Sequence, residues 1–362
     1  MSNYFAPALR VEVNGSNLAA DISKNIEQVS VISESNAIDT FSLTLLNQYP
    51  ALRWTHTRDA NLFGEGSIVK IAMGYVDDLQ EMIEGEITHI SPSFPEGGAP
   101  SVTIQGQTRL HWLHGDRTTR AFPSMTDKQI VDQIAAEAGL ESQSEDTGVT
   151  HDYVIQTNQT DLEFIRDRAQ KIHFEVLVKG KTLIFRRSNE VAARMYTFVW
   201  GHTQAFSAGN CLPLKSFTTT LNVVRPASQV EVRGYDILNK TSFVGRAATG
   251  DETSTMGGAT PGSQTAASAF HRPRRYVQVS VPVASQAEAD QRAKALLNNL
   301  GLEFITGNAS TIGVPDIRSG SVVELKGLGP RFSGEYLIDQ ATHTIGESGY
   351  QTDFTVKRNS SS

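Results

Sequence analysis

The chain has 362 residues, 39% of them hydrophobic and 20% charged, a composition typical of a globular protein with room for two to four domains. No apolar run reaches the roughly 18 residues that a membrane-spanning helix needs, and the single cysteine, Cys211, excludes intrachain disulfides and thiolate zinc clusters. The net charge of −7 argues against nucleic acid as the main partner and leaves protein partners open. The N-terminus lacks a basic stretch followed by an apolar core, so we expect a protein that is made and folded in the cytoplasm.

Residues 1–110 predict a first tube-like β-barrel. Apolar side chains alternate there in short runs separated by turn residues, which is the pattern of antiparallel strands. Asn14-Gly15 is a hairpin turn signal. The predicted strands cover residues 9–14, 28–32 and 41–47, an irregular segment covers 49–61, and strands resume from Gly66 to Arg109.

Residues 111–203 predict an inserted α+β domain. Thr126 with Gln129 forms one capping box and Thr160 with Glu163 another, and apolar residues at helical spacing follow each. The remaining predicted elements are a polar loop at 141–148, a short strand at 153–156 and a hairpin at 174–185.

Residues 204–362 predict a second tube-like β-barrel with a mobile loop at 240–270 and a helix at 285–300. Residues 240–270 are rich in Gly, Ala, Ser and Thr and contain few large apolar side chains, so we expect this segment to be mobile or ordered by a partner. Ser285 is the cap of the predicted helix. The polar tail at 359–362 is expected to fray.

Residues 66–109 and 320–358 share one pattern of three alternating strands that begins on Gly-Ser. The matched positions are Gly66-Ser67 with Gly320-Ser321 and Thr88-His89 with Thr342-His343. We interpret the chain as carrying two copies of a small barrel, although short strand patterns also resemble one another by chance.

No catalytic, cofactor-binding or metal-binding residue is predicted. His111 and His114 have the spacing of a helical metal pair, but no third ligand lies nearby in the sequence, so we interpret them as structural histidines. Asp77-Asp78 is interpreted as a solvated hairpin tip rather than a cation site.

Glu81, Glu84 and Glu86 are the carboxylates that could serve acid–base chemistry. Glycoside hydrolysis uses such pairs, but Glu84 and Glu86 would share the solvent-facing side of one strand, so we favour solvated carboxylates. The basic cluster Arg272-Pro-Arg-Arg275 is too short for a nucleic-acid stripe and is interpreted as a protein contact or a solvated strand edge.

Two regions resemble a known family. Residues 153–169, followed by Phe174-Glu-Val and Thr182-Leu-Ile-Phe185, are similar to the signature of the phage late control D proteins. Those proteins are related to the tail hub of contractile phages and to the N-terminal half of type VI secretion VgrG spikes. The C-terminal pattern adds Gly320-Ser-Val-Val-Glu-Leu, Phe332-Ser-Gly-Glu-Tyr, His343 and Gly349-Tyr-Gln-Thr.

The resemblance implies a mainly β fold with α+β insertions, and two tube-like antiparallel β-barrels per chain that assemble as a homotrimer with pseudo-sixfold symmetry. Its implied role is the structural hub of a contractile injection system or phage tail baseplate, joining a sixfold inner tube to a threefold central spike. The implied partners are the inner tube protein, a separate spike protein and baseplate wedge or sheath-side components, with no cofactor, nucleic-acid contact or membrane segment required. The chain ends at Ser362 without a needle domain, so we expect the spike to be another chain.

Two other classes of function remain open at this point. One is a tail-associated cell-wall (peptidoglycan) hydrolase that uses the carboxylates between Glu81 and Glu86. The other is a carbohydrate-binding β module. Turnover of peptidoglycan and binding of glycans distinguish these from a hub without catalysis.

Overall fold

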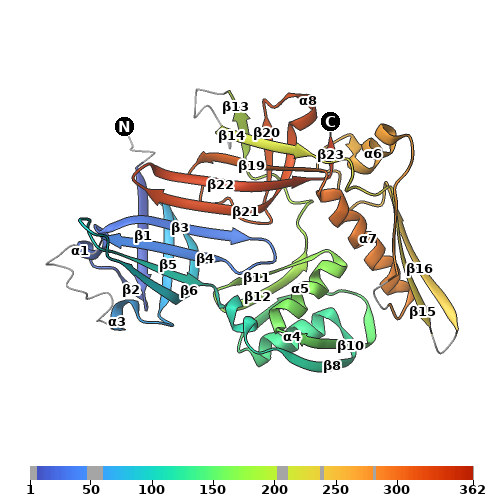
Figure 1. Cartoon of the computed structure of the whole chain (residues 1–362), viewed down its shortest axis with the longest axis horizontal. Coiled ribbons are helices and arrows are strands. Elements are labelled where there is room, and N and C mark those ends of the chain that lie inside the picture. The colour runs from blue at the N-terminus through green and yellow to red at the C-terminus, as the bar shows by residue number, and fades with distance from the viewer. Residues whose placement is uncertain (1–5, 47–59, 202–210, 237–239, 280–282, 362) are drawn as a thin grey trace.

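The computed structural model describes residues 6–46, 60–201, 211–236, 240–279 and 283–361. Figure 1 shows two groups of strands at the left and top, an α/β unit below them, and a helix with a strand pair at the right. The irregular segment predicted at 49–61 lies outside the described residues except for its last two.

Six strands from the first part of the chain form one curved sheet, which we call the first strand set. They are β1 (Pro7–Val13), β3 (Ile26–Glu34), β4 (Thr40–Leu46), β5 (Ile68–Tyr75), β6 (Asp78–Ser93) and β7 (Ser101–Gln107). Their lateral order is β1-β5-β6-β7-β4-β3, with the short β2 (Ser16–Asn17) outside β1. The short helices α1 (Ala20–Ser23) and α3 (Ala60–Phe63) lie in the connections. Buried and partly buried residues alternate along β4, which confirms the predicted period of two.

The predicted turn after β1 is confirmed. Asn14 and Gly15 both have positive φ, at +50° and +79°, the conformation of a tight hairpin turn between β1 and β2. Asp77 and Asp78 lie, as predicted, at the exposed tip of the β5–β6 hairpin.

Six strands from later in the chain form a closed barrel, which we call the second strand set. They are β13 (Thr197–Trp200), β14 (Cys211–Leu221), β19 (Ile305–Ile312), β20 (Val322–Lys326), β21 (Gly334–Gly346) and β22 (Gly349–Arg358), with α8 (Gly329–Phe332) between β20 and β21. Their order is β13-β20-β21-β22-β19-β14, and β13 also pairs with β14, which closes the ring. β13 lies inside the segment predicted as the inserted domain, whose boundary was placed at 203.

The two strand sets have the same topology. Numbered in chain order within each set, the strands are arranged 1-4-5-6-3-2 in both. The first strand differs in direction, because β1 is antiparallel to β5 whereas β13 is parallel to β20. The sets are joined into one sheet by antiparallel pairing of β3 with β21.

The first inserted unit has its own apolar core. Its elements are η1 (Arg109–His114), β8 (Thr118–Thr126), α4 (Asp127–Glu137), β9 (Glu141–Ser144), β10 (Thr150–Gln159), α5 (Asp161–Ile172), β11 (Phe174–Lys179) and β12 (Thr182–Arg187). Both predicted capping boxes are confirmed, since the hydroxyls of Thr126 and Thr160 accept from the third residue of α4 and α5. The predicted polar loop contains the strand β9, which pairs in parallel with β12.

A second inserted unit lies between β14 and β19, and the sequence did not predict it as a separate core. Its elements are β15 (Gln229–Asp236), β16 (Thr241–Ala248), β17 (Thr260–Pro261), α6 (Gly262–Phe270), β18 (Arg275–Gln278) and α7 (Gln286–Leu302). α7 begins after Ser285, whose hydroxyl accepts from the N–H of Glu288, and it packs on the β16-β15-β18 sheet.

The expectation of a mobile loop at 240–270 is wrong. β16 and α6 occupy much of this segment, and Met256, in the connection from one to the other, is fully buried beside Leu302 and Leu337. The small residues that suggested disorder instead allow close contacts, because a Cβ at Gly262 would overlap the ring of Phe304.

The expectation of a frayed tail is also wrong for residues 359–361. Ser360 and Ser361 form β23, which pairs with β17 and is buried. Arg358 before them is fully buried, donates to the carbonyl of Ser333 at 2.8 Å, and lies 5.4 Å from the ring centre of Tyr336.

Gly245 in β16 provides a test of how α7 is seated. A Cβ at this position would overlap the backbone carbonyl of Ala289 in α7, so Gly245→Ala is expected to force the helix off the sheet. We expect a loss of about 1–3 kcal/mol in the free energy of unfolding, measured by chemical denaturation. The control is Gly346→Ala in β21, where the nearest atom to the new methyl group is the carbonyl oxygen of Glu27 at 3.5 Å, an ordinary contact distance. Equal stability of the two variants would contradict this packing.

Candidate functional site

The two strand sets share several backbone features. The first is a turn, which in the first set precedes β5. Gly66 has a φ of +77°, a left-handed conformation that favours glycine. Its N–H donates to the carbonyl of Ile87 at 2.9 Å, and the N–H of Ile87 donates to the carbonyl of Ser67 at 3.0 Å. These two hydrogen bonds fix the start of β5 against β6.

The same turn occurs before β20. Gly320 has a φ of +76°, its N–H donates to the carbonyl of Ile338 at 2.8 Å, and the N–H of Ile338 donates to Ser321 at 2.9 Å. The predicted match of Gly66-Ser67 with Gly320-Ser321 is therefore confirmed.

Each set has a β-bulge directly after the residue to which this turn is hydrogen-bonded, Ile87 in the first set and Ile338 in the second. Thr88 is the extra residue of β6, between the pairs that Ile87 and His89 make with β7. Asp339 is the extra residue of β21, between the pairs that Ile338 and Gln340 make with β22. A bulge bends its strand and shifts all later pairing by one residue.

The bulges correct the second predicted match. Thr88 corresponds to Asp339, so the predicted match of Thr88-His89 with Thr342-His343 is wrong by three residues. That match assumed equal spacing in the two copies, but the hairpin between β5 and β6 uses more residues than the corresponding part of β20 and β21. A repeated Thr-His pair then aligned by chance.

A second pair of bulges extends the match to strands that the sequence comparison did not include. In β3 the pairing with β4 skips Glu27, and in β14 the pairing with β19 skips Lys215. These bulges are opposite Thr44–Leu45 and Ser310–Thr311, which occupy equivalent places in β4 and β19.

Buried polar contacts hold the joint between the sets. His343 of β21 is fully buried, with Nδ1 2.9 Å from the hydroxyl of Tyr350 and Nε2 2.7 Å from the carbonyl of Ile317. Burial, with the charge of Arg318, lowers the pKa of His343 to about 3. The neutral ring can therefore donate from Nε2 to the carbonyl of Ile317 and accept at Nδ1 from the hydroxyl of Tyr350, while Tyr350 packs in the core of the first set.

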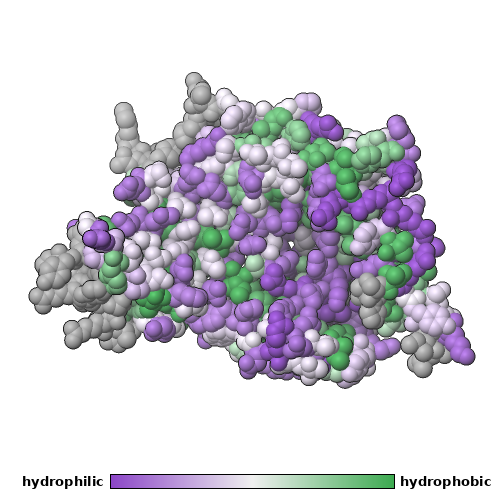
Figure 2. Space-filling model, viewed as in Figure 1, coloured by the Kyte–Doolittle hydropathy of each residue, from purple (hydrophilic) through white to green (hydrophobic). Residues whose placement is uncertain are grey.

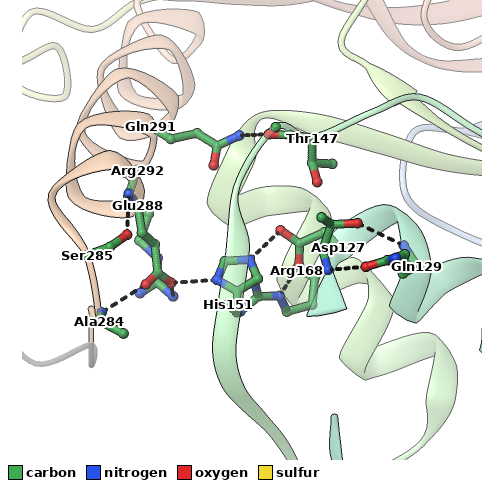
Figure 3. A network of polar contacts seen from close by, with 12 residues as sticks. Asp127, Gln129, Thr147, His151, Arg168, Ala284, Ser285, Glu288, Gln291 and Arg292 are labelled. Atoms are coloured by element: carbon green, nitrogen blue, oxygen red, sulfur yellow. Dashed lines mark hydrogen bonds and ion pairs between the residues drawn. The ribbon is translucent and has the colours of Figure 1, made fainter. Parts of the chain in front are cut away.

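A second polar cluster holds the two inserted units together (Figure 3). Asp127 of α4 receives hydrogen bonds from Arg168 of α5 at 2.5 Å and from His151 of β10 at 3.0 Å. On its other side His151 lies 3.5 Å from Glu288 of α7, which pairs with Arg292 at 2.6 Å. All five side chains are at most 7% exposed. The cluster contains an Asp–His pair but no hydroxyl or thiol nucleophile, so we assign it a structural role.

The carboxylates considered for catalysis are engaged in ion pairs. Glu84 lies 2.7 Å from Nζ of Lys70 and 2.5 Å from a guanidinium nitrogen of Arg109, which is itself 3% exposed. Burial raises the pKa of Glu84, but the hydrogen bonds and charges of Lys70 and Arg109 outweigh it and hold the pKa below its usual range. Glu84 is therefore unsuited to be a general acid, which needs a raised pKa.

Glu86 holds the start of the first inserted unit. One of its oxygens accepts from the indole N–H of Trp112 at 2.8 Å and lies 2.9 Å from Nε2 of His111. Glu84 and Glu86 are partly buried, so the expectation that they point to solvent is wrong, because η1 covers them. His111 and His114 do not share a ligand: His111 faces Glu86 and His114 is exposed.

Among the residues that the structure describes, no group of three or more His, Cys, Asp or Glu side chains could hold a metal ion. Within the same part of the chain no helix is both long enough and apolar enough to cross a membrane.

The basic cluster at 272–275 lies beside the sheet of the second inserted unit. Arg275 pairs with Glu231 of β15 at 2.5 Å, and Arg274 donates to the carbonyl of Arg225 at 2.6 Å. Arg275 is half exposed, which agrees with the interpretation as a solvated strand edge.

A cavity of about 420 Å³ lies where the strand sets meet the inserted units, near Asn36 and His173. His173 lies 2.5 Å from an oxygen of Glu190, and Lys357 pairs with Asp339 at 2.7 Å. These contacts engage His173, Asp339 and Lys357, and we assign the cavity no ligand.

Asp127 provides a test of the polar cluster. Burial raises the pKa of Asp127, but the hydrogen bond from His151 and the charge of Arg168 outweigh it, so the pKa is lowered. A lowered pKa adds stability that is present above the unfolded-state value, about 3.9, and lost as the pH falls below it. Asp127→Asn leaves Arg168 buried without a carboxylate, and we expect a loss of about 3–5 kcal/mol at pH 7.

The measurement is chemical denaturation of both proteins between pH 3 and 7. The difference between wild type and Asp127→Asn should shrink below about pH 4, because the carboxylate protonates there in the unfolded wild-type chain while it stays ionised in the folded one. Asp116→Asn, at an exposed position, serves as the control. A difference that does not change with pH would contradict the role of the charge.

Three solved structures of other proteins share the fold of this chain. The 43 kDa tail protein of prophage MuSo2 from Shewanella oneidensis is 13% identical with a TM-score of 0.70, covering 98% of both chains. The tail protein from Neisseria meningitidis MC58 is 14% identical with a TM-score of 0.69, covering 98% of this chain and 97% of that one. The E. coli c3393 protein, a component of the type VI secretion system, is 10% identical with a TM-score of 0.56, covering 97% and 77%.

At these identities the likeness shows the fold, which is that of phage tail proteins and of a type VI secretion component. No curated protein matches the sequence. A family model described as the Alg8 N-terminal domain matches residues 6–347, and that description names no tail component. By this match over most of its length, the chain belongs to the family described as the Alg8 N-terminal domain.

Proposed function

We propose that the chain is the structural hub of a contractile injection system or phage tail baseplate, of the phage late control D type. In this role three copies form a ring, and the ring joins a sixfold inner tube to a threefold central spike. The chain acts without catalysis and without a cofactor.

The observation that supports this proposal is the duplicated strand frame. Two sets of six strands share one lateral order and two bulge positions within one chain. Three such chains present six similar sets, which matches a sixfold tube with near-equivalent contacts while the other side of the ring keeps threefold symmetry. The fold of tail proteins in the solved structures supports the same assignment.

We propose that the chain has three domains. Residues 1–110 and 204–362 form the two tube-like barrels, and residues 111–203 form the inserted domain. Two observations refine this division. β13 belongs to the second barrel although it precedes residue 203, and residues 222–304 form a further unit within that barrel.

The proposed partners are two further copies of the chain, the inner tube protein, a separate spike protein and baseplate wedge or sheath-side components. Assembly takes place in the cytoplasm, and the finished hub is part of a tail-like particle. The inserted units, one below the strand sets and one to their right in Figure 1, are the parts that we propose to contact wedge or sheath-side components.

The ring has a direct test in the mass of the purified protein. Light scattering at micromolar concentration should give roughly 118 kDa, three times the 39.5 kDa chain. Particle images should show a ring with a central channel. A mass of one chain at every accessible concentration would overturn the hub.

The peptidoglycan hydrolase alternative is tested separately. We expect purified protein to release no soluble fragments from peptidoglycan, because Glu84 is held ionised by two cations. Glu84→Gln should leave this result unchanged, and a known cell-wall hydrolase serves as the positive control. Release of fragments that is lost in Glu84→Gln would support an enzyme.

A further inference from the structure

The two strand sets are joined by the pairing of β3 with β21, and the two strands that correspond to them are not paired with each other in the chain. Within the chain, β3 pairs with β21 beyond its bulge, through residues 29–34 and 340–345. By the bulge positions, the equivalent of β3 is β14 and the equivalent of β21 is β6. Because the two strand sets have the same topology, β14 has the same arrangement for pairing with a β6 strand as β3 has for pairing with β21.

The bulges show which residues of β6 and β14 correspond to the paired residues of β21 and β3. Gln340 and His89 each follow a bulge directly, and Gln28 and Ser216 each follow the other bulge. Residues 340–345 therefore correspond to 89–94, and residues 29–34 correspond to 217–222. The pairing of Thr342 with Ile32 becomes a pairing of Ser91 with Thr220.

Both counterpart edges are open in the part of the chain that the structure describes. Beyond its bulge, β6 pairs with β7 on one side, and its pairing with β5 ends at Glu86. β14 pairs with β19 along residues 214–221, and its pairing with β13 ends at Leu214. Pro92 has no N–H, so at this one position β6 offers a second strand a carbonyl acceptor but no donor.

The side chains on these edges suit a strand partner. In the transferred register Ile90 lies opposite Leu221, and both are half-buried at present. Phe94, which is 53% exposed, follows β6 and lies opposite the half-buried Phe217. Their positions match Ala341 and Ile345 of the internal joint, so pairing would bury apolar groups on the same face there.

The face of the molecule shown in Figure 2 carries no broad apolar area. Hydrophobic and hydrophilic residues are interspersed over the face shown in Figure 2. Interfaces made by strand edges draw on backbone hydrogen bonds, with a few side chains for specificity, rather than on a broad apolar area.

We propose that β14 of one copy pairs antiparallel with β6 of a second copy, with residues 217–222 opposite residues 89–94. This inference rests on the proposed hub function. The contact is heterologous, since different surfaces meet, so repetition produces a ring if the rotation closes. A ring of three copies has six joints of one kind, three within chains and three between them.

Disulfide formation tests the register. In a Cys211→Ser background, which removes the native thiol, Ser91→Cys chains are mixed with Thr220→Cys chains and oxidised. Both positions are exposed, so folding should be unaffected. Directly opposite residues in antiparallel strands have Cα atoms about 4.5–5.5 Å apart, which is inside the range of roughly 4.4–6.8 Å that disulfides span.

The expected product is a cross-linked dimer of one chain of each kind, and chains that carry both cysteines should give species of up to three chains. The matched control is Thr218→Cys in place of Thr220→Cys, which is two residues out of register on the same strand face and should cross-link at least tenfold more slowly. Equal rates for the two pairs, or no cross-link with Thr220→Cys, would overturn the joint.

A charge exchange tests the joint without oxidation. Ser91→Lys with Thr220→Lys places like charges opposite each other and should weaken trimer formation at least tenfold in light scattering. Ser91→Glu with Thr220→Lys should restore it. Trimers from the Lys/Lys chain that are as stable as wild type would also overturn the joint.

The two proposals fail separately. A wild-type trimer without the in-register cross-link keeps the hub and overturns this joint. A wild-type protein that stays monomeric and also forms no cross-link overturns both. A cross-linked product limited to two chains when both cysteines are present would show a closed dimer and overturn ring formation through this edge.

Discussion

The backbone pairing of β3 with β21 is the contact on which the rest of the molecule depends. It converts two strand sets, each with its own core, into parts of one sheet. β21 can serve both because it changes partner along its length: its first residues pair with β20 and residues 340–345 pair with β3. Asp339 lies at the change, and its carbonyl accepts from the N–H of Ser35 at 2.8 Å. The bulge thus turns one strand from its own barrel toward the neighbouring sheet.

The strand sets share their topology but are closed differently. In the second set the reversed strand β13 lies between β14 and β20 and completes the barrel. In the first set no pairing joins β1 to β3 among the described residues, and β21 lies along β3 instead. Tyr350 from β22 packs into the first core, and its ring centre is 5.9 Å from that of Tyr75. Each core therefore depends on residues of the C-terminal strands, which links the stability of both halves.

The sequence predicted those parts of the fold that depend on local pattern. Alternation in β4, the Asn14-Gly15 turn and the capping boxes at Thr126 and Thr160 are properties of a few neighbouring residues, and each was predicted correctly. The glycine at 66 and its repeat at 320 were also recognised, because a left-handed turn restricts the residue type.

The parts that sequence reasoning missed depend on distant contacts. Met256 is buried by Leu302 and Leu337, and Ser360 is ordered by pairing with β17, so composition alone suggested disorder for both segments. The ion pairs of Glu84 unite residues 70, 84 and 109, and alternation placed this carboxylate in solvent because it could not show that η1 covers it. The polar cluster of Asp127, His151 and Glu288 joins three elements that no short motif connects, although buried charges within apolar helix faces could have drawn attention to them.

The connection between the second and third strands differs greatly in length between the two halves. In the first half it is residues 35–39, and in the second it is residues 222–304. Closing a loop of 83 residues instead of five disfavours folding by only about 2.4 kcal/mol, at roughly 0.6 kcal/mol for each doubling, and less when the insert is itself folded. Hairpin tips on this frame are therefore permissive sites for acquiring whole modules, whereas a single-residue insertion inside a strand would turn every later side chain to the opposite face. Proteins with this strand topology can therefore gain or lose whole inserted units in the strand connections, whereas the lengths of the strands themselves stay fixed.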